Sequence, residues 1–176
     1  MMREFIFQTI RLGFSEWHSS DLNLAIDLWG DPLVARFISA KGAFSKKEIS
    51  ERLLKEIQNN LNYQVQYWPL FELEDGKMIG CCGLRPYNKE IQAFELGFHL
   101  KSEYWGKGYA FEAASAVLDH ARHNLNTDYI VAGHHPENTA SAKLLGKLGF
   151  EYTRHEYYEA TGLEHPTYIL KITPSQ

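Results

Sequence analysis

A glycine-spaced segment in the second half of the chain has the residue types of an anion-binding loop. Residues 95–110 read Glu-Leu-Gly-Phe-His-Leu-Lys-Ser-Glu-Tyr-Trp-Gly-Lys-Gly-Tyr-Ala and lead from a predicted strand through a turn into a predicted helix. Gly106 and Gly108 lack side chains, so the backbone can turn its N–H groups inward there. The following helix adds unpaired amides and the positive end of its dipole. This arrangement favours a diphosphate ligand.

The glycine spacing separates three families of phosphate-binding loop. A P-loop requires Gly, four residues and then Gly-Lys-Ser/Thr, whereas here Lys107 precedes Gly108 and Tyr109 follows. A dinucleotide-binding loop requires a third glycine where Phe111 stands, and an acid at the end of the next strand, whereas Asp128 precedes that strand. The spacing therefore excludes a P-loop and disfavours a dinucleotide-binding loop.

The third family is the GNAT superfamily of acetyl-CoA-dependent N-acetyltransferases, which the loop resembles. The family's loop reads Arg/Gln-x-x-Gly-x-Gly/Ala, and Gly108 and Ala110 match its last two positions. Residues 104–113 look most like the branch named for the ribosomal-protein alanine acetyltransferases RimJ and RimL. Residues 136–141 (Pro-Glu-Asn-Thr-Ala-Ser) and 147–150 (Lys-Leu-Gly-Phe) are similar to a second motif of that branch. With the order of predicted elements, the resemblance covers nearly the whole chain.

The resemblance implies which residues contact acetyl-CoA, the expected co-substrate. Loop amides would hold the diphosphate, the preceding strand would pair with the pantetheine arm, and Asn138 and Ser141 would face that arm. The implied cofactor-binding residues are Phe98, His99, Leu100, Trp105, Gly106, Lys107, Gly108, Tyr109, Ala110, Asn138 and Ser141. Two positions depart from the family: Trp105 replaces its Arg/Gln, and Leu145 stands where many members have a tyrosine proposed as the general acid.

Glu95 is the candidate general base, because it matches a family glutamate often assigned that role through a bridging water. The alternative is an ordinary strand carboxylate paired with a neighbouring cation. An α-amino group costs roughly 1 kcal/mol to deprotonate at pH 7 and a lysine about 4.6 kcal/mol, so a modest base could serve an α-amine. Ser141 is the candidate general acid, although the thiolate could also leave without one. His99 alternates in register with Glu95 and Gly97 and shares their face of the strand.

Other reactive side chains are interpreted as structural. His134 and His135 are adjacent, and no Cys/His/carboxylate set completes a metal-ligand spacing, so no metal site is predicted. Cys81 and Cys82 are neighbours in a predicted strand, which points them to opposite faces as two small buried hydrophobes. Packing is also the favoured role of the strand aromatics, and lining of an acceptor pocket is the alternative; they are Tyr63, Tyr67, Trp68, Tyr157 and Tyr158.

The composition of the 176-residue chain favours neither nucleic acid nor membrane as a partner. With 18 basic and 22 acidic residues, the formal net charge is -4, which gives no general attraction to phosphate backbones or anionic lipid. Charges interrupt every apolar stretch well short of the roughly 20 residues that span a bilayer. Residues 1–8 lack the apolar core and cleavage site of a secretory signal. We therefore expect a cytoplasmic protein.

The length and composition of the chain predict a single domain with a core from about residue 7 to 172. The family resemblance implies that this is an N-acetyltransferase domain over residues 1–176. The fold class expected is α/β (α+β), with a GNAT-like mixed, mostly antiparallel sheet of about seven strands and helices on both faces. The predicted strands span residues 7–14, 63–73, 78–84, 93–100, 129–132, 151–158 and 167–172, with a turn over 85–90 and helices starting near Ser20, Ser45, Gly108 and Pro136.

The function expected is acetyl transfer from acetyl-CoA to a primary amine, directly within a ternary complex. Two kinds of acceptor fit this expectation, a peptide or protein N-terminus and a small-molecule amine. The chain is expected to be a monomer or a homodimer. The alternative is a catalytically silent acyl-CoA-binding module, for which the missing tyrosine leaves room. A third interpretation, a nucleotide-binding regulator, requires ATP or NAD to outcompete CoA for the loop.

Overall fold

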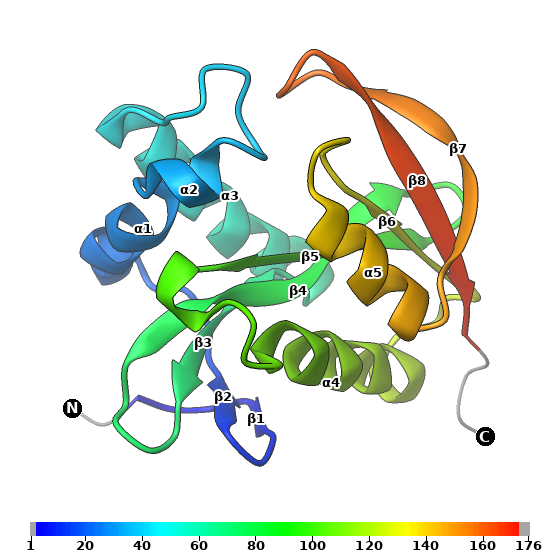
Figure 1. Ribbon diagram of the computed structural model, residues 1–176. Helices are drawn as coiled ribbons and strands as arrows, with labels where there is room; N and C mark the ends of the chain where they lie inside the picture. Colours follow the sequence, from blue (N-terminus) through cyan, green and yellow to red (C-terminus); the bar gives the residue numbers. More distant parts are fainter. Residues whose placement is uncertain (1–2, 173–176) are drawn as a thin grey trace.

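The computed structural model describes residues 3–172, which form an eight-stranded sheet flanked by helices (Figure 1). The strands are β1 (Phe7–Gln8), β2 (Leu12–Phe14), β3 (Tyr67–Glu72), β4 (Met78–Asn88), β5 (Ala93–Leu100), β6 (Tyr129–Gly133), β7 (Glu151–Tyr158) and β8 (Leu163–Lys171). The helices are α1 (Leu22–Trp29), α2 (Pro32–Ala35), α3 (Lys46–Tyr63), α4 (Tyr109–Asn124) and α5 (Thr139–Lys147), with 3-10 turns at Ser19–Asp21 and Ser102–Tyr104.

The strand order is β1-β2-β3-β4-β5-β6-β8-β7. Among the described strands, β5 and β6 are parallel neighbours and the other adjacent pairs are antiparallel. The expected mixed, mostly antiparallel sheet with helices on both faces is therefore confirmed. No helix within residues 3–172 combines the length and the apolar character needed to cross a membrane.

Each face of the sheet carries its own apolar core. One core packs β-strand side chains against α4 and Leu145 of α5, and the other packs them against α1 and α3. Figure 1 shows α4 and the α1–α3 group on opposite sides of β4 and β5. Cys82 belongs to the first core and Cys81 to the second, and both thiols are free and buried. The prediction of two buried cysteines on opposite faces is confirmed.

The start of the sheet differs from the prediction of one strand over residues 7–14. The segment folds back on itself, so that β1 and β2 form a short antiparallel hairpin. Thr9 closes the turn, since its N–H donates to the Leu12 carbonyl at 2.8 Å and its Oγ1 accepts from the Leu12 N–H at 3.0 Å. This hairpin makes the sheet eight-stranded instead of seven-stranded.

The strand predicted to begin at Tyr63 is wrong in its first part. The capping box of Ser45 and Glu48 starts α3 as predicted, but the helix continues to Tyr63. Gln64 then adopts a left-handed conformation (φ 58°) and closes the helix by donating its N–H to Asn60. The alternation of polar and apolar residues misleads here because the polar Gln66 is fully buried.

The turn predicted over residues 85–90 is also misplaced. β4 continues to Asn88, and Arg85 pairs with Glu95 across the β4–β5 ladder. The chain reverses after Asn88 and passes through Gln92, which has a φ of 50°. The longer β4 places Arg85 beside the candidate base.

Candidate active site

The parallel strands β5 and β6 separate after a short contact. They pair only at Phe94–Ile130 and Glu95–Val131, although β5 continues to Leu100. Beyond Glu95, the β5 edge that faces β6 therefore has no strand partner, and its backbone groups can bind an extended ligand. A cavity of about 770 Å³ opens here, lined by both strands, the start of α4, α5 and residues from α2 and α3.

Side chains of β5 reach the two sides of the sheet alternately. Glu95 and His99 lie opposite Arg85 and Cys81 of β4, on the face covered by α1 and α3. Leu96, Phe98 and Leu100 belong to the core beneath α4. The cavity therefore joins an α4 side, where the glycine loop lies, to an α1–α3 side, where Glu95 and His99 lie.

The glycine loop has the backbone shape expected of an anion site. Gly106 and Gly108 have φ values of 70° and 81°, a left-handed conformation that suits glycine. Gly108 is the residue before α4, which begins at Tyr109. Within the described chain, the amides of residues 106–111 have no hydrogen-bond acceptor. These amides are thus available to a diphosphate such as the one in acetyl-CoA. Binding of the diphosphate by the loop, including by Lys107 and Ala110, stays a prediction.

Arg11 holds this loop in place from the β1–β2 turn. Its Nη1 donates to the Lys107 carbonyl at 3.0 Å, and its Nε and backbone N donate to Glu112 at 2.7 and 2.9 Å. Its guanidinium also lies 4.1 Å from the centre of the Tyr109 ring. Sequence reasoning missed Arg11 because no local pattern links it to a loop about a hundred residues away.

Trp105 fixes the beginning of the loop against the end of β5. Its indole Nε1 donates to the Leu100 carbonyl at 2.9 Å, while the side chain stays 41% exposed at the cavity. The tryptophan in place of the family's Arg/Gln thus supplies a structural hydrogen bond and leaves the loop amides free.

The second predicted motif starts α5 at the cavity wall. Asn138 is the N-cap, and its Oδ1 accepts from the Ser141 N–H at 3.1 Å. The side-chain amide of Asn138, predicted to face the pantetheine arm, thus uses its oxygen in capping, and its Nδ2 group stays available to a ligand. Ser141 is buried at the cavity wall. Leu145 is buried in the core and offers no hydroxyl.

Glu95 lies where β5 and β6 part, half-buried in the cavity wall. Burial raises the pKa of its carboxyl; Arg85 opposes that shift, Glu156 adds to it, and a Tyr67 hydrogen bond opposes it. The hydrogen bond of Arg85 goes to Glu56 and not to Glu95, because its Nε donates to Glu56 at 2.9 Å. No ion pair among residues 3–172 includes Glu95. Glu95 thus lacks a direct ion-pair partner within the described residues, and its role as general base stays a prediction.

Tyr67 of β3 packs across β5 beside Glu95. A Cβ at Gly97 would collide with the Tyr67 ring, so Gly97 is required for this approach. The Arg85 guanidinium lies 3.9 Å from the centre of the same ring. Burial raises the pKa of the Tyr67 phenol well above its usual value, which keeps the hydroxyl protonated as a donor. Tyr67, interpreted from sequence as packing, therefore both packs and lines the cavity.

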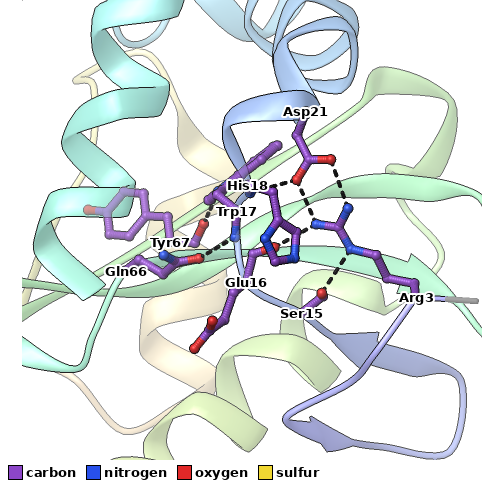
Figure 2. A network of polar contacts seen from close by, with 8 residues as sticks. All are labelled: Arg3, Ser15, Glu16, Trp17, His18, Asp21, Gln66 and Tyr67. Carbon is purple, nitrogen blue, oxygen red and sulfur yellow. Dashed lines mark hydrogen bonds and ion pairs between the residues drawn. The ribbon is translucent and has the colours of Figure 1, made fainter. Parts of the chain in front are cut away.

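A polar network anchors the backbone of Tyr67 (Figure 2). The Trp17 indole donates to the Tyr67 carbonyl at 2.6 Å, and the Trp17 N–H donates to Gln66 at 2.8 Å. Figure 2 shows that Arg3 holds the segment around Trp17, because its guanidinium makes two 2.8 Å hydrogen bonds to the buried Asp21. The network joins the N-terminal segment to the wall of the cavity.

The hydrogen bonds of His99 define its protonation state. Its Nδ1 lies 3.1 Å from Trp29 Nε1, which can only donate, so Nδ1 must carry a lone pair. Burial, with Arg52 and Arg85 nearby, holds the pKa of His99 well below its usual value. The ring is therefore neutral with its proton on Nε2, and it serves as a donor in the cavity wall.

The adjacent histidines bind protein groups. His134 Nδ1 lies 2.7 Å from the His135 carbonyl, and its Nε2 lies 3.3 Å from the Tyr168 hydroxyl. Among residues 3–172, no group of three His, Cys, Asp or Glu side chains is arranged to hold a metal ion.

These features define a class of mixed-sheet protein with two elements that suit an extended, diphosphate-bearing ligand. One is the separation of the parallel strands β5 and β6, and the other is the glycine loop. Residues 11–151 match the family model of the Acetyltransferase (GNAT) domain. The chain is 29% identical, over 93% of both sequences, to the uncharacterized N-acetyltransferase p20 of Bacillus licheniformis.

Solved structures show the same fold. The chain resembles RimL, a ribosomal L7/L12 α-N-protein acetyltransferase in complex with coenzyme A, with a TM-score of 0.82 and 15% identity over 98% of this chain and 100% of that one. It also resembles spermidine N-acetyltransferase from Vibrio cholerae in complex with CoA and spermine, with a TM-score of 0.76 and 18% identity over 93% and 96%. The chain belongs to the GNAT family and is an acetyl-CoA-dependent acyltransferase.

Proposed function

We propose that this protein moves the acetyl group of acetyl-CoA directly to a primary amine in a ternary complex, with Glu95 as the general base. The observation that carries the proposal is a half-buried carboxylate, free of any ion pair among residues 3–172, at the point where β5 and β6 separate. A raised pKa suits a base, because it makes the carboxylate a better proton acceptor near neutral pH.

The proton balance of the transfer makes a base useful. Acetyl-CoA supplies the acetyl group as an activated thioester. The acceptor nitrogen forms a bond to the carbonyl carbon as the carbon–sulfur bond breaks, and the amine loses one proton, which Glu95 takes directly or through a water. An unpaired carboxylate can accept that proton, whereas one held by an arginine would resist it.

The leaving sulfur needs less help than the amine. A thiolate with a pKa near 8.5 costs only about 2 kcal/mol to release unprotonated at pH 7. Ser141, buried at the cavity wall, is the proposed donor to that sulfur. Leu145 is core, so any tyrosine-based acid step must come from another element.

The test compares Glu95→Gln with the wild type in an assay of amine-dependent CoA release. We expect turnover to fall about 100-fold or more, the usual effect of losing a general base, with acetyl-CoA still raising the melting temperature. Glu151→Gln, at an exposed position on β7, is the matched control and should leave turnover unchanged. Unchanged turnover in Glu95→Gln across pH 6 to 9 would remove Glu95 from the mechanism.

The same assay separates catalysis from a catalytically silent binding module. Such a module would be stabilised by acetyl-CoA yet release no CoA with any amine. Amine-dependent release by the wild type rules that alternative out.

A further inference from the structure

Arg52 of α3 is an unsatisfied cation in the wall of the cavity. Its Nε is buried and has no hydrogen-bond partner, and none of the ion pairs among residues 3–172 includes Arg52. The guanidinium lies 5.2 Å from the ring centres of both Trp29 and Phe44. Arg52 as a whole is half-buried, and a charge that is partly withdrawn from water without an acidic partner is costly, so we infer that it has a use.

The acidic side chain that acts on Arg52, Glu56, is already occupied. Glu56 lies one helical turn from Arg52, but its Oε1 accepts from Arg85 and its Oε2 accepts from the Tyr67 N–H at 2.8 Å. Arg85 and Glu56 therefore form an ion pair, and Arg52 has no acidic side chain to pair with among the described residues. Burial, followed by the repulsion of Arg85, lowers the pKa of Arg52, and the opposing effects of Tyr158 and Glu56 do not cancel that shift.

The position of Arg52 assigns it to the acceptor side of the cavity. Trp29 packs under Arg52 and donates to His99, which shares its face of β5 with Glu95. The glycine loop leads into α4, on the opposite face of the sheet. A diphosphate at the loop amides therefore leaves Arg52 for the other substrate. Arg36, exposed at the same cavity, adds a second positive charge.

We propose that Arg52 is a specificity-determining residue that binds a carboxylate of the acceptor, so that the preferred acceptor is an amine that also carries a carboxylate. This inference rests on the proposed function. A planar guanidinium binds a carboxylate through two parallel hydrogen bonds, and the buried setting strengthens them. A polycation such as spermine, which the Vibrio cholerae structural neighbour binds, would instead meet like charge at Arg52 and Arg36, although Glu137 and Glu156 also line the cavity.

The experiment measures kcat/KM by CoA release for two matched pairs of peptide. In the first pair, Ala-Ala is compared with its C-terminal amide, which tests a terminal carboxylate. In the second, Ala-Asp-amide is compared with Ala-Asn-amide, which tests an acidic side chain. Spermidine is the cationic acceptor. The variants are Arg52→Met, Arg52→Lys and the control Arg122→Met, which removes an exposed arginine of α4 paired with Asp119.

In the wild type, we expect the carboxylate-bearing member of at least one pair to be favoured about 10- to 100-fold, the effect of a charge-assisted hydrogen bond. Arg52→Met should abolish this preference and leave the acetyl-CoA-induced rise in melting temperature intact. Arg52→Lys should keep part of the preference, and Arg122→Met should keep all of it. A role of Arg52 in packing alone would lower kcat/KM equally for both members of each pair.

Two results overturn the inference, and they differ from failure of the proposed function. Equal kcat/KM for both members of both pairs in the wild type means that the enzyme does not recognise a carboxylate on the acceptor. An equal loss for both members in Arg52→Met means that Arg52 supports the fold and not the choice of acceptor. Absence of CoA release with every amine, despite stabilisation by acetyl-CoA, overturns the acetyl transfer itself and this inference with it.

Discussion

The Glu95 carboxylate carries an electrostatic cost that its proposed role explains. Its pKa is raised by burial, so the charged form is less favourable in the folded protein than in the unfolded chain. The sign follows directly: the cost is present at neutral pH and disappears as the pH falls through the raised pKa. A structural carboxylate would show the opposite sign.

Replacing Glu95 by Gln should therefore stabilise the protein while it slows turnover. The neutral amide removes the buried charge and keeps the shape, so we expect a higher urea midpoint for Glu95→Gln at pH 7 and no difference at a pH below the carboxyl pKa. The measurement is urea unfolding at pH 7 and pH 4. A variant that is less stable than the wild type at pH 7 would show that Glu95 holds the fold together.

Single residues divide into those that sequence reasoning could find and those that it could not. Gly106, Gly108 and Glu95 lie in one continuous segment, so their spacing alone suggested an anion loop next to a carboxylate. The proposed role of Arg52 was not predicted, because it depends on the lack of an ion-pair partner for this arginine. That lack is visible only in the structure, where Glu56 bonds to Arg85.

At the scale of elements, the turn between β1 and β2 supports the start of α4. Arg11 reaches from that turn to the Lys107 carbonyl and to Glu112, and it covers the Tyr109 ring. Without Arg11, the loop would lose the contact that orients one of its peptide groups, and Glu112 would lose its counter-ion. Arg11 is a positioning residue, since it acts on the ligand through the loop.

Arg11→Ala should therefore weaken the use of acetyl-CoA more than the use of the acceptor. We expect the KM for acetyl-CoA to rise about 10-fold, the loss of one or two charge-assisted hydrogen bonds, with a smaller change in the KM for the amine. Steady-state kinetics with each substrate varied in turn make the comparison. Arg122→Ala, which removes an arginine of α4 paired with Asp119, serves as the control. Equal changes in both KM values would mean that Arg11 only stabilises the fold.

The prediction of whole elements succeeded where a local signal was strong. The Ser45–Glu48 capping box located the start of α3, and the β5 strand was predicted with its observed bounds. It failed where tertiary contacts decide: Gln66 is buried by its bonds to Trp17 and Glu56, which no alternating pattern encodes. The extension of β4 to Asn88 likewise depends on pairing with β5.

At the scale of the whole molecule, the order of elements was predictable but the shape of the cavity was not. The cavity arises because β5 and β6 pair only at their first residues, while β8 inserts between β6 and β7. Strand order and the extent of pairing are long-range properties. The β7–β8 hairpin also brings His165 near His135, with ring centres 5.7 Å apart, which links the fold to pH.

Buried histidines should make the stability of the whole molecule fall as the solution becomes acidic. Burial, reinforced by His135 and His134, lowers the pKa of His165 to about 4, and burial also lowers the pKa of His99 and His134. An unfolded histidine titrates near 6.5, so between pH 6.5 and 4 the unfolded chain binds more protons than the native one. The contribution of His165 is therefore complete above pH 6.5 and is lost progressively as the pH falls towards 4.

Urea unfolding at intervals from pH 7.5 to 4.5 tests this expectation, with the free energy of unfolding predicted to decrease steadily below pH 6.5. His165→Gln, which cannot titrate and can still bond to Thr161, should reduce the slope. His123→Gln, at an exposed position on α4, is the matched control and should leave the slope unchanged. If His165→Gln and the wild type lose stability in parallel over this range, His165 titrates normally in the folded protein, and the acid sensitivity belongs to other groups.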